Sequence, residues 1–174
     1  MQKSREKRVK SRRLPSIIFV TGPSGAGKST LARALAKELA YQLLSLDVIR
    51  EKYRGDTGKA WLEIWARAKR GKPTVIDATG ASKIFRLVFR AVSFRQLRPV
   101  VVKLTADERV LGIRRSEVPS AHPHIALRSG LSVTERYLNE AAEFLPGGLE
   151  IDTTNISPRA VFYRALGYVS SGAA

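Results

Sequence analysis

At 174 residues, with 44% hydrophobic and 26% charged side chains, the chain has the composition of a globular protein and a length that fits one domain. It has no cysteine and no apolar run approaching roughly 18 residues, which excludes disulfides, thiolate catalysis, cysteine metal sites and a transmembrane helix. Its 31 Lys and Arg against 15 Asp and Glu give a net charge of +16, which favours a polyanionic partner such as nucleic acid, although a solubility role would explain the same charge.

The positive charge is densest at the N-terminus. Residues 1–13 hold seven basic side chains and one glutamate, so we expect residues 1–15 to form a basic disordered tail. We expect one folded domain over residues 16–168 and a short disordered tail over 169–174. The composition predicts a soluble cytoplasmic protein without a membrane partner, and the sequence leaves the oligomeric state open.

Apolar runs and helical patterns alternate along the folded part. Short, largely β-branched runs predict buried parallel strands at residues 16–20, 43–46, 73–80, 100–105 and 149–152. Apolar residues at helical spacing predict helices at residues 31–40, 48–55, 60–71, 83–97, from 106 onward, 132–144 and 157–167. This alternation predicts an α/β fold, a five-stranded parallel sheet with helices on both faces.

Capping signals predict where several helices begin and end. Thr105-Ala-Asp-Glu108 and Ser132-Val-Thr-Glu135 match capping boxes, in which a hydroxyl and a glutamate satisfy free backbone amides. Ser157-Pro158 predicts a cap followed by proline at the first helical position. Gly71 and Gly167 are predicted helix stops.

A glycine-rich loop lies between the first strand and the first helix. Gly22-Pro-Ser-Gly-Ala-Gly27-Lys28-Ser29 fits the pattern G-x-x-x-x-G-K-[ST], which binds a nucleoside triphosphate with magnesium. Lys28 would neutralise the β- and γ-phosphates, and Ser29 would ligate Mg²⁺. A purely structural turn would explain neither side chain. The predicted ATP-binding residues are Gly22, Ser24, Gly25, Ala26, Gly27, Lys28, Ser29 and Thr30.

Asp47 follows the second apolar run, and Arg50 comes one helical turn later. Ligands bind at the carboxyl ends of parallel strands, where Asp47 and Asp77 are both predicted to lie. Asp47 could accept the proton of a hydroxyl acceptor, and Arg50 could hold an anionic group of that acceptor. An aspartate that merely caps the following helix is the alternative. Because the chain lacks N-K-x-D and L-S-G-G-Q elements, kinases are the best class of P-loop protein for it.

The order TGPSGAGKST, LDVIR, TVIDATG, then arginines after VVVKLT, resembles the P-loop kinases related to the kinase domain of polynucleotide kinase. That group also contains zeta-toxin-like and small-molecule kinases, and the resemblance covers about residues 16–168. It implies ATP and Mg²⁺ as cofactors, Asp47 as the base and Arg50 as a ligand of the substrate phosphate. It also implies that Asp77 orients that arginine or a magnesium-bound water. The group usually has Asn after D-A-T, where this chain has Gly80.

The resemblance also implies an arginine-bearing lid, here at about residues 114–130, and a segment at residues 152–161 that covers adenine. The transferred phosphate would be bridged by Arg114 or Arg115, between which the sequence does not choose. An arginine that closes onto the developing charge would accelerate transfer, whereas a solvated basic helix is the alternative. His122 and His124 lack a nearby partner and are read as incidental.

Three functions fit these residues. The first is an ATP-dependent kinase acting on a 5′-hydroxyl end of RNA or DNA, supported by basic residues that include the predicted substrate ligand Arg86. Few aromatic side chains are free to stack bases, which weakens this hypothesis. The second is a kinase for a small molecule such as a metabolite, nucleotide sugar or antibiotic. The third is a non-catalytic, nucleotide-gated module that binds nucleic acid.

Overall fold

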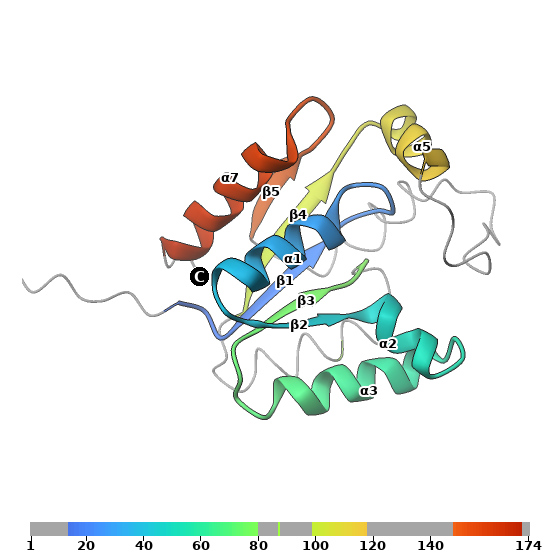
Figure 1. Cartoon of the computed structure of the whole chain (residues 1–174), viewed down its shortest axis with the longest axis vertical. Helices are drawn as coiled ribbons and strands as arrows, with labels where there is room; N and C mark the ends of the chain where they lie inside the picture. The colour runs from blue at the N-terminus through green and yellow to red at the C-terminus, as the bar shows by residue number, and fades with distance from the viewer. Residues whose placement is uncertain (1–13, 80–86, 88–98, 118–147, 172–174) are drawn as a thin grey trace, which may run out of the picture.

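A computed structural model of the chain describes residues 14–79, 87, 99–117 and 148–171, which form one parallel sheet flanked by helices (Figure 1). The strands are β1 (Ile17–Thr21), β2 (Gln42–Ser45), β3 (Thr74–Asp77), β4 (Val100–Thr105) and β5 (Leu149–Asp152). The helices are α1 (Lys28–Glu38), α2 (Leu46–Lys52), α3 (Thr57–Ala68), α5 (Glu108–Glu117) and α7 (Pro158–Ser170). In this part of the chain, no helix is long and apolar enough to cross a membrane.

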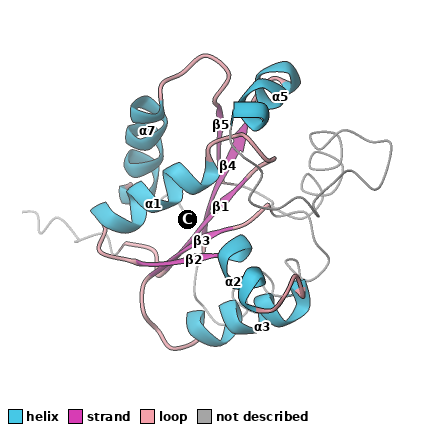
Figure 2. Ribbon diagram, turned by 45° about the vertical axis from the view of Figure 1, so that its right-hand side comes forward, coloured by secondary structure: helices cyan, strands magenta, loops and turns pink. Residues whose placement is uncertain are grey.

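The five strands are all parallel and follow the order β2-β3-β1-β4-β5. The predicted fold class is therefore confirmed. Because successive side chains of a strand point to opposite faces, the apolar strands feed two separate cores. In Figure 2 the sheet separates α1 and α7 from α2 and α3.

Each face of the sheet has its own hydrophobic core. Ile18, Val20 and their neighbours pack with α1 and α7, where Leu35 and Ala165 are fully buried. The alternate residues of β1, including Phe19, pack with α2 and α3, where Trp61 is fully buried. The two cores hold the carboxyl ends of the strands in a fixed relation to one another, which is what a site at this edge requires.

The strand register aligns the carboxyl ends at one edge. Asp77 of β3 lies opposite Val20 of β1 and Ser45 of β2. Asp152 of β5 lies opposite Thr105 of β4. The segments that follow these strands therefore meet at one edge of the sheet.

Three predicted boundaries were wrong. The second strand ends at Ser45, one residue early, so Asp47 lies in the first turn of α2. Thr105 belongs to β4, and α5 begins only at Glu108, where the Asp107 carboxylate accepts the amide of Arg109 at 2.9 Å. The predicted capping box therefore does not form, because the strand pairing holds its hydroxyl residue in extended backbone.

The last helix also differs at one end. Ser157 caps α7 as predicted, with its hydroxyl accepting from the Ala160 amide at 3.2 Å and Pro158 in the first position. Gly167 does not stop the helix, which continues to Ser170 because Val169 packs into the core. The helix therefore includes two of the residues predicted to belong to the C-terminal tail.

Several predictions lie outside the described residues. They concern the tail over residues 1–13, most of the helix at 83–97 with Arg86, the lid beyond residue 117 with both histidines, and the capping box at Ser132.

Candidate active site

The loop between β1 and α1 passes so close to β4 that its first position requires glycine. Gly22 has a φ of 151°, and a Cβ atom there would lie 2.3 Å from the carbonyl oxygen of Leu104. On the other side, a Cβ atom on Gly25 would lie 3.0 Å from the carbonyl oxygen of Leu111 in α5. The loop is therefore held between a strand and the start of the predicted lid.

Lys28 begins α1 and reaches back over this loop. Its Nζ donates a hydrogen bond of 2.9 Å to the carbonyl of Pro23, and its side chain is buried. Burial lowers the pKa of Lys28, while the negative charges of Asp77 and Asp47 raise it. A buried cation beside a helix N-terminus suits phosphate oxygens.

Asp77 lies at the end of β3, against the same loop. Its Oδ2 accepts a hydrogen bond of 3.4 Å from the Ser45 hydroxyl. Burial raises the pKa of the Asp77 carboxyl, whereas a hydrogen bond from Ser29 and the charge of Lys28 lower it. These contacts hold Asp77 beside the phosphate loop. Of the two roles that the resemblance implies for Asp77, this position favours orienting a magnesium-bound water over orienting Arg50.

Ser29 and Asp77 together fit a magnesium ion that arrives with a nucleotide. They offer a hydroxyl and a carboxylate oxygen, and Mg²⁺ usually takes only one or two protein ligands beside phosphate and water. In the ranges that the structure describes, no group of three or more His, Cys, Asp or Glu side chains could hold a metal ion by itself.

Asp47 and Arg50 form an ion pair on α2. Arg50 Nη2 lies 3.2 Å from Asp47 Oδ1, with side-chain exposures of 16% and 42%. That nitrogen is buried and has no hydrogen-bond partner within the described chain. Ser45 occupies the N-cap position of α2, so Asp47 is not the cap that the alternative interpretation supposed.

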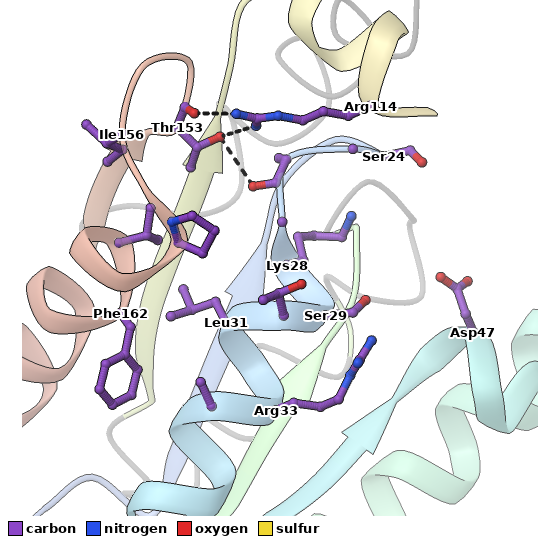
Figure 3. Close-up of a pocket in the computed structure, with 17 residues that line it drawn as sticks. Ser24, Lys28, Ser29, Leu31, Arg33, Asp47, Arg114, Thr153, Ile156 and Phe162 are labelled. Carbon is purple, nitrogen blue, oxygen red and sulfur yellow. Dashed lines mark hydrogen bonds between the residues drawn. The ribbon is translucent and has the colours of Figure 1, made fainter. Parts of the chain in front are cut away.

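A cavity of about 670 Å³ joins these segments at the carboxyl edge. Residues 24–31 line its centre, and Asp47 lines one side. In Figure 3, Lys28 and Ser29 lie between Asp47 and the side chain of Phe162 on α7. Gly22, Arg50, Asp77 and Arg115 are not among the lining residues that the structure describes.

The end of the cavity beside α7 is largely apolar. Ile156, Pro158, Val161 and Phe162 line it, together with Ala34 of α1. An apolar slot next to a phosphate-binding loop suits the flat base of a nucleotide.

Arg114 and Arg115 lie differently although they are neighbours on α5. Arg114 lines the cavity, and its two terminal nitrogens donate to the hydroxyl and the carbonyl of Thr153 at 3.1 and 2.8 Å. Arg115 donates through Nε to the carbonyl of Leu111 at 3.0 Å. The structure thus separates two arginines that the sequence treats as equivalent.

Thr153 lies in the segment over residues 152–161 that was expected to cover adenine, but the sequence analysis did not single it out as a site residue. It directly follows β5, is 4% exposed and lines the cavity. Asp47 and Asp77 were found because they are acidic residues after an apolar strand. The same positional rule, extended to hydroxyl side chains, would have found Thr153.

Residues 17–117, more than half of the chain, match the family described as AAA domain. The chain belongs to this family of P-loop proteins. It is 30% identical over 161 residues to a protein of Pyrococcus abyssi provisionally assigned as an adenylate kinase, covering 90% of this chain and 85% of that one. It is 31% identical over 164 residues to the shikimate kinase of Alteromonas mediterranea, covering 83% and 91%.

The chain is an ATP-dependent P-loop kinase. Solved structures show the same fold. The shikimate kinase of Acinetobacter baumannii, in complex with shikimate, has a TM-score of 0.65 at 20% identity and covers 92% of this chain and 95% of its own. The gluconokinase of Sinorhizobium meliloti has a TM-score of 0.59 at 22% identity, with 92% and 94% covered. The predicted kinase activity is therefore confirmed, whereas the narrower resemblance to polynucleotide kinase is not.

The relatives of this P-loop kinase also bear on the acceptor. The curated relatives named above carry the names of an adenylate kinase and a shikimate kinase, both of which refer to small molecules. They favour the second of the three functions over the nucleic-acid kinase that the sequence ranked first.

Proposed function

We propose that this kinase transfers the γ-phosphate of ATP to a hydroxyl group of a small molecule that also carries a carboxylate or phosphate. The observation that carries the proposal is the pair Asp47 and Arg50, a carboxylate on the cavity wall with a largely buried guanidinium behind it. The kinases to which the chain is similar support an acceptor of this size.

In this proposal, the phosphate loop and Lys28 hold the nucleotide. Loop amides and the buried ammonium face the β- and γ-phosphates and balance charge that builds up during transfer. Ser29 and Asp77 would hold a Mg²⁺ ion, which would supply positive charge to offset that of the phosphates. The apolar end beside Phe162 would take the adenine.

Asp47 is the proposed general base. Its carboxylate accepts the proton of the acceptor hydroxyl as that oxygen bonds to the γ-phosphorus, while the bond to the ADP oxygen breaks. Such a base contributes about 100-fold to 10,000-fold. Its position on the cavity wall, across the phosphate loop from Phe162, supports this role, because the acceptor would approach on the side opposite ADP.

Arg50 is proposed to select anionic acceptors. Its buried Nη2 is ion-paired with Asp47 but lacks a hydrogen bond within the described chain, and an acceptor carboxylate or phosphate could supply one. The guanidinium also matches such groups in a bidentate arrangement. Since Arg50 lies behind Asp47, the anion and the reacting hydroxyl would belong to the same small molecule.

The test is incubation with γ-labelled ATP and matched acceptors. The panel would contain hydroxy acids, sugar acids and nucleoside monophosphates, their uncharged amide or nucleoside counterparts, and 5′-hydroxyl oligonucleotides. We expect label on an anionic small molecule and at least 10-fold less on its uncharged counterpart. Label on oligonucleotides alone would overturn the proposal.

A 5′-hydroxyl kinase is the second candidate. It is favoured by the net charge of +16, which would draw a nucleic acid toward the site. The oligonucleotide arm of the panel tests it directly.

A further inference from the structure

Thr153 connects three segments that line the nucleotide cavity. Its hydroxyl oxygen lies 3.3 Å from the carbonyl oxygen of Ala26 in the phosphate loop and 3.0 Å from that of Thr105 at the end of β4. The same oxygen accepts a hydrogen bond of 3.1 Å from Arg114 Nη1 on α5. Figure 3 shows the bonds that join Thr153 to Arg114 and to the phosphate loop.

The hydroxyl has a single proton, so its two carbonyl partners compete for it. The Thr105 carbonyl already accepts the backbone amide of Thr153 at 2.8 Å. The proton is therefore available to the Ala26 carbonyl without leaving Thr105 unsatisfied. The lone pairs of the hydroxyl oxygen then face Arg114, which links the arginine to the phosphate loop through one buried oxygen atom.

Arg114 is fixed at both of its terminal nitrogens. In addition to the hydroxyl contact, Nη2 donates to the Thr153 carbonyl at 2.8 Å. A guanidinium that donates to two acceptors keeps one orientation, whereas a single contact leaves it free to rotate. Arg114 would break both bonds to reach over the γ-phosphate, so its place is at the nucleotide end of the cavity.

We propose that Thr153 is a positioning residue that orients Arg114 against bound ATP and couples it to the phosphate loop. This inference rests only on nucleotide binding at the proposed site, and it is independent of the acceptor.

The experiment measures ATP affinity by calorimetry with no acceptor present, so a wrong acceptor assignment cannot affect it. Thr153→Val keeps the shape of the side chain and removes the hydroxyl, and we expect it to weaken ATP binding about 5-fold to 20-fold. Thr153→Ser restores the hydroxyl and should bind ATP within about 2-fold of the unaltered chain. Maximal slow ATP hydrolysis should change less than affinity in both variants.

Thr154→Val is the matched control. Its hydroxyl belongs to the same loop but bonds the Asp152 carboxylate at 2.6 Å and the Asp107 amide at 2.8 Å, and it makes no hydrogen bond to Arg114 in the described structure. We expect it to lower the melting temperature without weakening ATP binding. Equal losses of affinity in the two valine variants would show a general loop effect and overturn the proposal.

Arg114→Lys by itself tests the arginine and does not require the Thr153 variant to fold. Combined with Thr153→Val, it completes a double-mutant cycle. Lysine cannot make two parallel bonds, so ATP binding should weaken on the order of 10-fold. Added to Thr153→Val, it should weaken binding by less than about 3-fold further, because the two residues act as a unit. Unchanged ATP affinity in Arg114→Lys, or fully additive effects, would overturn the inference.

Discussion

Arg50 illustrates how a single residue can define an acceptor. It lies in the last turn of α2, and its buried Nη2 is ion-paired with Asp47 at 3.2 Å but has no hydrogen-bond partner among the described residues. A guanidinium that is ion-paired but not fully hydrogen-bonded keeps donors for an anionic ligand. The substrate preference of the kinase is therefore expected to depend on this side chain.

We predict that Arg50→Met raises the KM for the acceptor by about 10-fold to 100-fold and leaves the KM for ATP within about 2-fold, because one charge-assisted contact is lost. Steady-state kinetics with each substrate varied in turn would measure both. Lys59→Met, which removes an exposed cation from neighbouring α3, is the control and should change neither constant. A larger effect on ATP than on the acceptor would place Arg50 in the nucleotide site.

At the scale of elements, the phosphate loop depends on its close approach to β4. We predict that Gly22→Ala lowers the free energy of unfolding by more than about 3 kcal/mol, since the new methyl group would collide with the Leu104 carbonyl. Gly71→Ala, also at positive φ but with no atom within 4 Å, should lower it by about 1 kcal/mol. Urea unfolding would measure both. Equal losses of unfolding free energy in the two variants would mean that Gly22 is required only for its positive φ and not for its close approach to β4.

Helices α2 and α3 are joined by Glu63. Its Oε2 accepts from Lys52 Nζ and from the Tyr53 hydroxyl, each at 2.7 Å, and its Oε1 lies 3.0 Å from Arg67 Nη2. These contacts hold the helix that carries Asp47 against its neighbour. The cluster therefore supports the acceptor side of the site without touching it.

We predict that Glu63→Gln lowers the melting temperature by roughly 2–4 °C, because it removes the charge that three donors share. It should also reduce kcat/KM for the acceptor more than kcat/KM for ATP. Calorimetry and kinetics would measure these changes, with Glu38→Gln on α1 as an exposed control. An unchanged melting temperature would show that α2 is held by its apolar contacts alone.

The elements differ in how far the sequence could predict them. Buried apolar runs such as Ile17–Thr21 identify parallel strands without tertiary information, and G-x-x-x-x-G-K-[ST] identifies the phosphate loop. The capping box at Thr105 failed because sheet pairing outweighed a local helix signal. The roles of Arg114 and Thr153 could not be predicted, because their contact joins segments 39 residues apart.

At the scale of the whole molecule, the net charge of +16 is a feature that the similarity to small-molecule kinases does not explain. Charge, together with the resemblance to the kinase domain of polynucleotide kinase, ranked nucleic acid first among acceptors in the sequence analysis. It acts at long range and reports on encounter with anions, whereas acceptor identity depends on contacts at the site. A basic protein can therefore be a small-molecule kinase.

We predict that kcat/KM for the acceptor falls by less than about 10-fold between roughly 50 and 200 mM salt, since one or two charge contacts are screened. An acceptor held by 6–10 phosphate contacts would lose about 1,000-fold or more over the same range. The measurement is acceptor kinetics at saturating ATP in a salt series. A loss of about 1,000-fold in kcat/KM would favour nucleic acid over a small molecule as the acceptor.

The most direct test of the proposed reaction is the single-turnover rate of γ-phosphate transfer in Asp47→Asn, measured by rapid quench with ATP and the labelled acceptor. We predict a loss of at least about 100-fold, with ATP affinity unchanged, because only proton removal from the acceptor is impaired. Glu51→Gln, one turn further along α2, should transfer phosphate at the original rate. A rate in Asp47→Asn equal to that of the unaltered chain would contradict the proposed reaction.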